Sequence, residues 1–259
     1  MKIRMLGAHN LESRDTRSST LLIDSILALD AGALTSTLTF EEQLALKAVL
    51  ITHHHYDHIK DLVMLGATFY NNERQIHIYA PLAVYEAVRY LLQYPGKLYI
   101  DFLGKPEGDP TFKFTVVQPL KPFTVEQYEI LAVPVSHSVP AVGYQVADTN
   151  GKKLFYTGDT GPGLDECWQH ISPDLLVIEN TASDRYIRVA REVKHMSPGL
   201  LKEELISFRK IKGYLPRIVT THHFPHEGEE EERRVELEQL ARELDASITI
   251  GNEGLELEL

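Results

Sequence analysis

The stretch Ile51-Thr52-His53-His54-His55-Tyr56-Asp57-His58 places four histidines and an aspartate, all of which can bind metal ions, within six residues. It follows the short apolar run Ala48-Val49-Leu50-Ile51, which predicts a buried strand that ends where the histidines begin. Side chains alternate between the two faces of an extended segment, so His53 and His55 can point the same way while His54 points elsewhere. The stretch therefore predicts a metal-binding loop at the end of a strand.

The second half of this stretch extends the prediction from one ion to two. Asp57 and His58 follow where the chain turns, and they can supply an oxygen and a nitrogen to a second ion. A solvated, histidine-rich loop would explain an isolated His-x-His pair, but not the strand in front of it or the Asp-His pair behind it. The pattern His53-x-His55-x-Asp57-His58 resembles that of the metallo-β-lactamase superfamily. This resemblance implies further landmarks downstream, in a set order.

Length and composition limit the class of protein. A chain of 259 residues can bury a sizeable core, and we expect a single domain over residues 1–259 because no repeat or linker-like tract divides it. The start of the chain is too short for the apolar part of a signal peptide, and no apolar run approaches a membrane span. The single cysteine, Cys167, excludes an intramolecular disulfide and a zinc site with several cysteines. We expect a cytoplasmic protein without a membrane partner.

The charge of the chain bears on its partners. A formal net charge of −11 argues against stable polynucleotide binding, because that affinity comes largely from lysine and arginine displacing counterions. A small anionic substrate remains compatible with this charge, since bound divalent ions reverse the local field. We therefore expect a small-molecule substrate.

Two of the downstream landmarks follow apolar strands in the middle of the chain. The run Ile130–Val135 leads into His137, and the segment after it resembles the one that follows the third histidine of the superfamily. Lys153–Tyr156 leads into Thr157-Gly158-Asp159, where the glycine lets the backbone come close to the ions. An aspartate in that turn can bridge two ions and lower their mutual repulsion. Neither residue would indicate a site if it stood alone.

The last landmark lies near the C-terminus. Arg217-Ile218-Val219-Thr220-Thr221 leads into two histidines and repeats the order of apolar strand, threonine and histidine found at Ile51-Thr52-His53. Only one of two adjacent histidines at a strand end can face the metals, and the parallel selects His222. His223 and His226 are then expected as surface or pocket-rim residues.

With these landmarks the resemblance spans nearly the whole chain and implies both a fold and a ligand set. The implied fold is an αββα sandwich of the α/β class, with two mixed β-sheets face to face and helices outside. The implied metal sites are His53, His55 and His137 for the first ion, Asp57, His58 and His222 for the second, and Asp159 between them. Two divalent ions are expected. Zinc is the default for borderline nitrogen and oxygen ligands, and manganese or iron also fit such ligands.

Asp57 and His195 are the candidate catalytic residues. His195-Met196-Ser197-Pro198 precedes a predicted helix, with Ser197 as N-cap and Pro198 in the first turn. This segment resembles one in the phosphodiesterase-like branch of the superfamily, which includes class II cyclic-nucleotide phosphodiesterases and tRNA 3′-processing nucleases. In that branch the histidine contacts the scissile phosphate or protonates the leaving group; an exposed loop histidine is the alternative. Glu179 ends a buried strand, where it either fixes a ligand histidine or caps the next segment.

The remaining elements follow from periodicity, caps and turns. We expect strands over Lys2–Leu6, Thr20–Leu29 and Ile76–Tyr79, helices over Thr39–Lys47, Ile59–Phe69 and Pro81–Tyr94, and closing β structure over Ser247–Leu259. The loop 7–19, with His9 and Glu12, lies either in solvent or at the mouth of the site. Residues 95–125 are irregular, and their aromatic side chains either wall a pocket, form a homodimer contact or simply pack. The acidic run 227–232 and the helix after it predict a solvated face.

Three classes of function compete. The first is a dinuclear metal-dependent phosphodiesterase acting on a small phosphodiester such as a cyclic nucleotide, with His195 assisting the leaving oxygen. The second uses the same ions on a lactone, a thioester or another carboxyl ester or amide, and His195 is then incidental. The third is a non-catalytic or RNA-processing module, which the apparently complete ligand set and the net charge oppose. In the first two classes the ions lower the pKa of water, so hydrolysis needs no serine or cysteine nucleophile.

Overall fold

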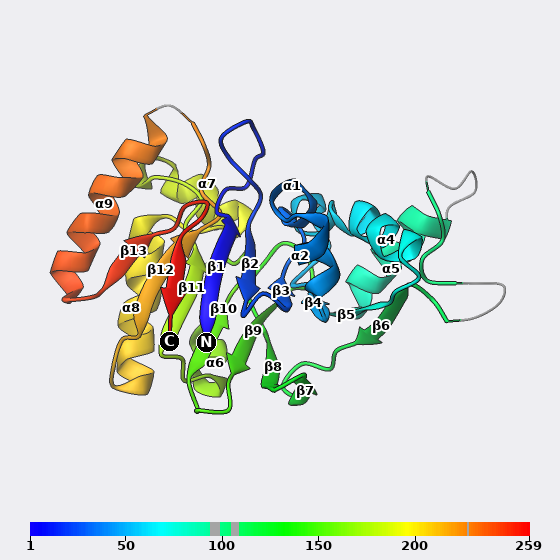
Figure 1. The fold of residues 1–259 in the computed structure, drawn as a ribbon. Coiled ribbons are helices and arrows are strands. Elements are labelled where there is room, and N and C mark those ends of the chain that lie inside the picture. Colours follow the sequence, from blue (N-terminus) through cyan, green and yellow to red (C-terminus); the bar gives the residue numbers. More distant parts are fainter. Residues whose placement is uncertain (94–98, 105–108, 227) are drawn as a thin grey trace.

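The computed structural model describes residues 1–93, 99–104, 109–226 and 228–259. Within these ranges two mixed β-sheets of seven strands each lie face to face (Figure 1). The first sheet has the order β14 (Glu256–Glu258), β1 (Lys2–Gly7), β2 (Thr20–Ile23), β3 (Leu27–Leu29), β4 (Ala48–Leu50), β5 (Ile76–Ala80) and β6 (Phe112–Val116). The second has the order β13 (Ile248–Ile250), β12 (Arg217–Thr221), β11 (Leu175–Glu179), β10 (Lys153–Tyr156), β9 (Val142–Ala147), β8 (Tyr128–Pro134) and β7 (Phe123–Val125).

Alternating side chains on the strands create three apolar layers. On β10 the side chains of Leu154 and Tyr156 join a core between the two sheets, while Phe155 joins a core on the outer face. On β4 the side chain of Leu50 faces the inner core and Val49 faces the opposite outer core. A strand with apolar residues on both faces must be covered on both sides. Each sheet is therefore buried between its partner sheet and a layer of helices.

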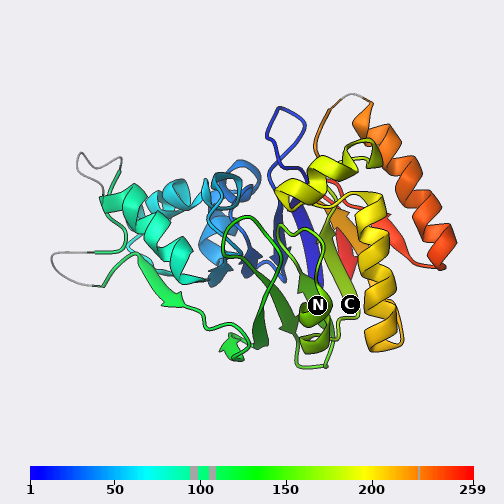
Figure 2. The ribbon, with the colours of Figure 1, turned by 180° about the vertical axis from the view of Figure 1, so that it is seen from behind.

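The helices form the two outer layers (Figures 1 and 2). Those beside the first sheet are α1 (Leu34–Thr37), α2 (Phe40–Ala45), α4 (Leu62–Asn71) and α5 (Leu82–Gln93), with the short α3 (Tyr56–Ile59) in the loop after β4. Those beside the second are α6 (Asp165–His170), α7 (Ile187–Val193), α8 (Pro198–Lys212) and α9 (Glu229–Leu244), with the 3₁₀ turn η1 (Asp184–Tyr186) before α7. The predicted αββα sandwich is confirmed, and no described helix is long and apolar enough to cross a membrane.

Several predicted elements have different bounds. Thr20–Leu29 is not one strand but the antiparallel hairpin β2–β3, because Asp24 and Ser25 turn the chain with φ of 46° and 61°. The helix predicted over Ile59–Phe69 is split, since α3 ends at Ile59 and α4 begins at Leu62.

Two other regions also depart from the predictions. The stretch 95–125, expected to be irregular, supplies β6 and β7, although residues 95–98 and 105–108 lie outside the described ranges. The closing β structure divides between the sheets, with β13 pairing to β12 and β14 to β1. The prediction of a single domain stays a prediction.

The sheet topology decides where the site lies. Strands β10, β11 and β12 are parallel neighbours, so their carboxyl ends meet at one edge of the second sheet. The carboxyl end of β4 faces that edge from the first sheet: the backbone N–H of Val142, at the start of β9, donates to the carbonyl of Thr52. In open α/β sheets this carboxyl edge is where ligands bind. Loops from both sheets can therefore place side chains around one point.

Candidate metal centre

The predicted ligands come together at this carboxyl edge. His53 and His55 follow β4, His137 follows β8, Asp159 follows β10 and His222 follows β12. Two groups of four side chains each have one potential ligand atom per residue, and all ligand atoms of a group lie within 4.8 Å of one another. These groups are His53, His55, His137 and Asp159, and Asp57, His58, Asp159 and His222.

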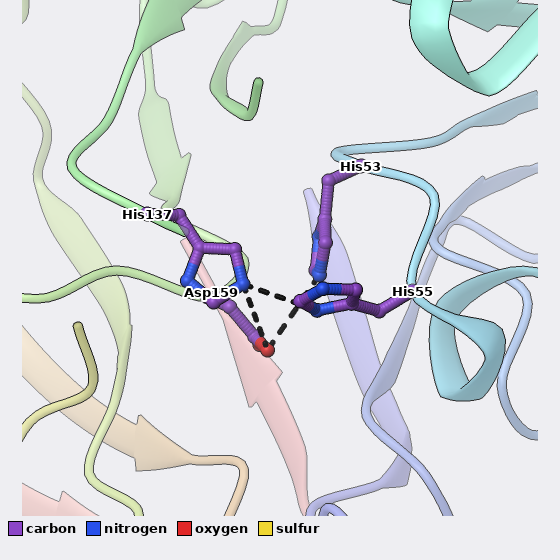
Figure 3. A group of neighbouring side chains, drawn as sticks. All are labelled: His53, His55, His137 and Asp159. Carbon is purple, nitrogen blue, oxygen red and sulfur yellow. Dashed lines mark hydrogen bonds and ion pairs between the residues drawn. The ribbon is translucent and has the colours of Figure 1, made fainter. Parts of the chain in front are cut away.

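In the first group the rings of His53, His55 and His137 converge on the Asp159 carboxylate from two loops (Figure 3). His53 Nε2 lies 3.6 Å and His137 Nε2 lies 3.9 Å from Asp159 Oδ2. His55 Nδ1 lies 3.1 Å from His137 Nε2. Three imidazole nitrogens and a carboxylate oxygen around a common centre are the arrangement expected of ligand atoms around a cation.

The second group uses the other oxygen of the same carboxylate. Asp159 Oδ1 lies 3.1 Å from His58 Nε2 and 3.3 Å from His222 Nε2. Asp57 Oδ2 lies 3.4 Å from His58 Nε2 and 3.3 Å from His222 Nε2. Asp159 therefore presents one oxygen to each group, which is the geometry that a bridging carboxylate requires.

Asp30 orients two of the predicted ligand histidines, His58 directly and His53 through Thr52. Its side chain is fully buried, and its Oδ2 accepts the Nδ1–H of His58 at 2.8 Å. The Thr52 hydroxyl donates to the same carboxylate at 3.0 Å, and it can therefore accept the Nδ1–H of His53, also at 3.0 Å. A hydrogen bond at Nδ1 leaves the lone pair of Nε2 free for a metal. In both rings Nε2 is the atom that faces the cluster.

Lys194 and Thr181 orient two further histidines, His137 and His222, in the same way. The backbone carbonyl of Lys194 accepts the Nδ1–H of His137 at 3.2 Å, and the Lys194 ammonium donates to the His137 carbonyl at 3.1 Å. The Thr181 hydroxyl donates to Glu179 Oε2 at 2.7 Å, so it accepts from His222 Nδ1 at 2.9 Å. Both contacts again direct Nε2 to the cluster.

The electrostatics of the cluster suit a cation. Burial lowers the pKa of His53 well below its usual value, so the ring is in the neutral form that binds metals. Burial also acts on Asp159, but the attraction of His222 and His58 outweighs it and holds the pKa of that carboxyl well below its usual range. Among the described residues, His53 Nε2, His58 Nε2 and Asp159 Oδ1 are buried without a hydrogen-bond partner. Buried polar atoms left unpaired are costly, and divalent ions at the two groups would satisfy all three.

His195 lies against the same cluster and is held by Glu179. One ligand atom each from Asp159, Glu179, His195 and His222 lies within 4.8 Å of the others, and the rings of His195 and His222 stack with centroids 5.4 Å apart. Glu179 Oε1 accepts the Nδ1–H of His195 at 2.7 Å. Burial lowers the pKa of His195, but the Glu179 carboxylate more than offsets this and raises it to about 9. Glu179 thus contacts His195 directly, and it contacts the predicted ligand His222 only through the Thr181 hydroxyl.

The histidines close in sequence to the predicted ligands, His54, His223 and His226, lie outside the two groups. His54 is outside both groups, as the alternation of the strand predicts. His223, expected at the surface or pocket rim, is instead buried: it is 2% exposed, and its Nδ1 bonds to the Asn180 carbonyl. His226 does line a cavity.

The loop 7–19 and the acidic run also differ in detail from a simple solvated surface. His9 bonds to Glu253 at 2.7 Å, and Glu12 pairs with Lys60 at 2.8 Å. Glu229 in the acidic run is buried and accepts the backbone N–H of Ser183, while Glu227 lies outside the described residues. The acidic run is therefore only partly the solvated face that was expected.

Three of the residues that build this site were not predicted from the sequence: Asp30, Lys194 and Thr181. Asp30 and Lys194 act through contacts 28 and 57 positions away along the chain, and Thr181 through one 41 positions away. For Asp30 the only local indication is its place at the end of an apolar run, and for Thr181 its place after Glu179. Lys194 gives no local indication at all.

The fold and the two side-chain groups together define a class, the proteins of the metallo-β-lactamase fold. A family model for the β-lactamase superfamily domain matches residues 20–224. The chain therefore belongs to this superfamily. That family implies divalent ions, and the two side-chain groups fit them.

Individual relatives are distant. Ribonuclease Z of Methanocaldococcus jannaschii is 24% identical over 168 residues, which cover 64% of this chain and 47% of that protein. The chain spans about half the length of the curated ribonuclease Z relatives that it matches. The metallo-β-lactamase fold protein YhfI from Bacillus subtilis superposes with a TM-score of 0.79 at 20% identity, and unliganded yeast PDE1 with 0.84 at 16%. Both alignments cover 100% of this chain and 99% of the other, and at such identities they establish the fold alone.

Proposed function

We propose that this protein is a phosphodiesterase for a small substrate such as a cyclic nucleotide. The observation that carries the proposal is the Glu179–His195 pair beside the cluster. A histidine held at Nδ1 by a carboxylate presents Nε2–H to the space over the metals, where a reacting phosphate would sit. Expelling an alkoxide from a phosphodiester benefits from a positioned acid, whereas a lactone or thioester has less need of one.

The ligand assignment is part of this proposal. Two divalent ions, zinc by default, would be held by His53, His55 and His137, by Asp57, His58 and His222, and by Asp159 between them. When bound, such ions supply Lewis-acid stabilisation and lower the pKa of water to near neutrality. Asp57 is the more open of the two carboxylates, with its side chain 27% exposed against 3% for Asp159. It is therefore placed to orient the attacking water, while His195 donates its Nε2 proton to the leaving oxygen.

A small substrate fits better than a structured RNA. Relatives named ribonuclease Z make RNA processing an alternative, but the net charge of −11 opposes a long phosphate track. A cytoplasmic location and a homodimer stay predictions.

The test is His195→Ala on two phosphodiesters. An alkyl-type diester, such as a cyclic nucleotide, needs its leaving oxygen protonated, whereas p-nitrophenolate leaves readily as an anion. We expect the variant to keep its metals, lose about 10²–10⁴ in rate on the alkyl diester and lose much less on bis-p-nitrophenyl phosphate. Equal losses on both substrates would indicate that His195 positions the phosphodiester and does not protonate the leaving oxygen. An unchanged alkyl rate would remove the acid role and favour a lactone, a thioester or another carboxyl ester or amide as the substrate.

A further inference from the structure

A cavity of about 460 Å³ opens directly beside the metal centre. It lies between α7, the segment after β12 and the start of α9. His195 and Thr181 belong both to its lining and to the cluster, because His195 faces Asp159 and Thr181 bonds to His222. Any group in this cavity therefore lies on the side of the centre where His195 is held.

The walls of the cavity are apolar and partly aromatic. Val189 and Val193 share one face of α7 by their spacing, and Tyr186 precedes them as the N-cap residue. Tyr186, Val189 and Val193 are 46%, 54% and 49% exposed. Phe224 faces them from the segment after β12, and its ring lies parallel to that of His226, with an interplanar angle of 3°. Large apolar side chains left in contact with water on a concave surface favour an apolar ligand. Flat aromatic walls suit the face of a planar ring.

One buried carboxylate, that of Glu229, limits which planar ring the cavity can bind. Glu229 lines the cavity, is 5% exposed and accepts the backbone N–H of Ser183 with Oε2 at 3.2 Å. Three further acidic residues follow it in the first turn of α9: Glu230, Glu231 and Glu232. A carboxylate repels anions but accepts hydrogen bonds from N–H or O–H groups. The cavity therefore disfavours a second phosphate and favours an uncharged group with apolar faces and a donor at its edge.

We propose that this cavity binds the uncharged heteroaromatic part of the substrate, such as a nucleobase, while the phosphodiester lies over the metals. The proposal rests on the phosphodiesterase function proposed above and adds a source of substrate selectivity to it. Base–aromatic contacts stabilise binding without charge, which suits an acidic protein. A polynucleotide continuing through the cavity would bring a phosphate against Glu229, so the substrate ends there.

The first experiment fills the cavity and compares two substrates with the same reactive ring. Adenosine 3′,5′-cyclic phosphate carries a base, and 1,3-propanediol cyclic phosphate has the same six-membered phosphodiester ring without one. We expect Val189→Trp to lower the ratio of their kcat/KM values by about 10- to 100-fold, the equivalent of one base–aromatic stack. Arg188→Trp is the matched control, since Arg188 is the exposed neighbour on α7 outside the cavity lining. An unchanged ratio in Val189→Trp would overturn the proposal.

The second experiment measures binding without turnover. Adenosine has no phosphate, so its binding to the metal-loaded protein can be followed by saturation-transfer NMR. We expect a signal with the wild type and Arg188→Trp, and a loss of signal with Val189→Trp. If no diester is hydrolysed but adenosine binds in this pattern, the phosphodiesterase function fails and the cavity assignment stands. If diesters are hydrolysed without base selectivity and adenosine does not bind, only the cavity assignment fails.

Discussion

Asp30→Asn tests whether this buried carboxylate sets the affinity of the second ion. Its four hydrogen bonds come from Thr52 N at 2.8 Å, the Thr52 hydroxyl at 3.0 Å, His58 Nδ1 at 2.8 Å and the Tyr156 hydroxyl at 2.9 Å. An asparagine has one acceptor oxygen and turns an NH₂ group toward one side of this network. With the oxygen kept on Thr52, the NH₂ faces His58, which then shifts its proton to Nε2. His58 Nε2, the atom that faces Asp159, then has no lone pair to offer a metal ion.

The size of the effect follows from the number of ligands disturbed. One of the second site's histidines loses its support, and changes in such supporting residues cost about 10–100-fold in metal affinity. This corresponds to about 1.4–2.7 kcal/mol. We expect the zinc affinity of the site with His58 to fall by this factor while the other affinity changes less, because His53 keeps the Thr52 hydroxyl. Competition with a chromophoric chelator measures both affinities.

Asp24→Asn is the matched control for this experiment. Asp24 also accepts a tyrosine hydroxyl, that of Tyr128, and the Lys2 backbone N–H, but it lies at the β2–β3 turn without a ligand histidine. We expect it to bind both ions like the wild type. If Asp30→Asn folds and binds two ions with unchanged affinities, the orienting role of Asp30 is wrong.

Two further predictions concern the ions themselves. Asp159→Ala removes the one carboxylate shared by both groups, so we expect the loss of metal content by elemental analysis together with the loss of hydrolase activity; full activity without metal would contradict the mechanism. Chelation should lower Tm, since ions bound only by the folded state stabilise it and their removal leaves the buried His53 and His58 nitrogens unpaired. Differential scanning fluorimetry with zinc added back checks this, and an unchanged Tm would refute it.

The parts of the site that could be predicted from sequence are those encoded locally. Apolar runs that end in a histidine or an aspartate predict where each strand stops, and the spacing of His53 and His55 predicts which rings face one way. The repeated order of strand, threonine and histidine also favoured His222 over its neighbour, and the structure places His222 in the cluster. These inferences need only the geometry of one strand and its following loop.

The parts that failed depend on distant contacts or on unusual backbone. The hairpin within Thr20–Leu29 was missed because Asp24 and Ser25 adopt positive φ without the glycine or asparagine that normally indicates such a turn. The burial of His223 comes from contacts with Ala8 and Asn180, which belong to loops far away in the sequence. The local pattern therefore predicted a surface or pocket-rim residue. Neither contact is visible in the local pattern.

The residues before α8 show how distant contacts unite these parts into one site. α7 ends at Val193, and its C-cap Lys194 has φ of 60°; this left-handed residue turns the chain so that its carbonyl meets His137 while the next residue, His195, meets Glu179. At the opposite end of the same short helix, the N-cap residue Tyr186 lines the cavity. One element therefore fixes a predicted ligand, the proposed acid and the cavity wall relative to one another. A shift of α7 would move His137, His195 and the cavity wall together. No local motif encodes the position of α7, so the ligand motifs alone cannot specify the geometry of the whole site.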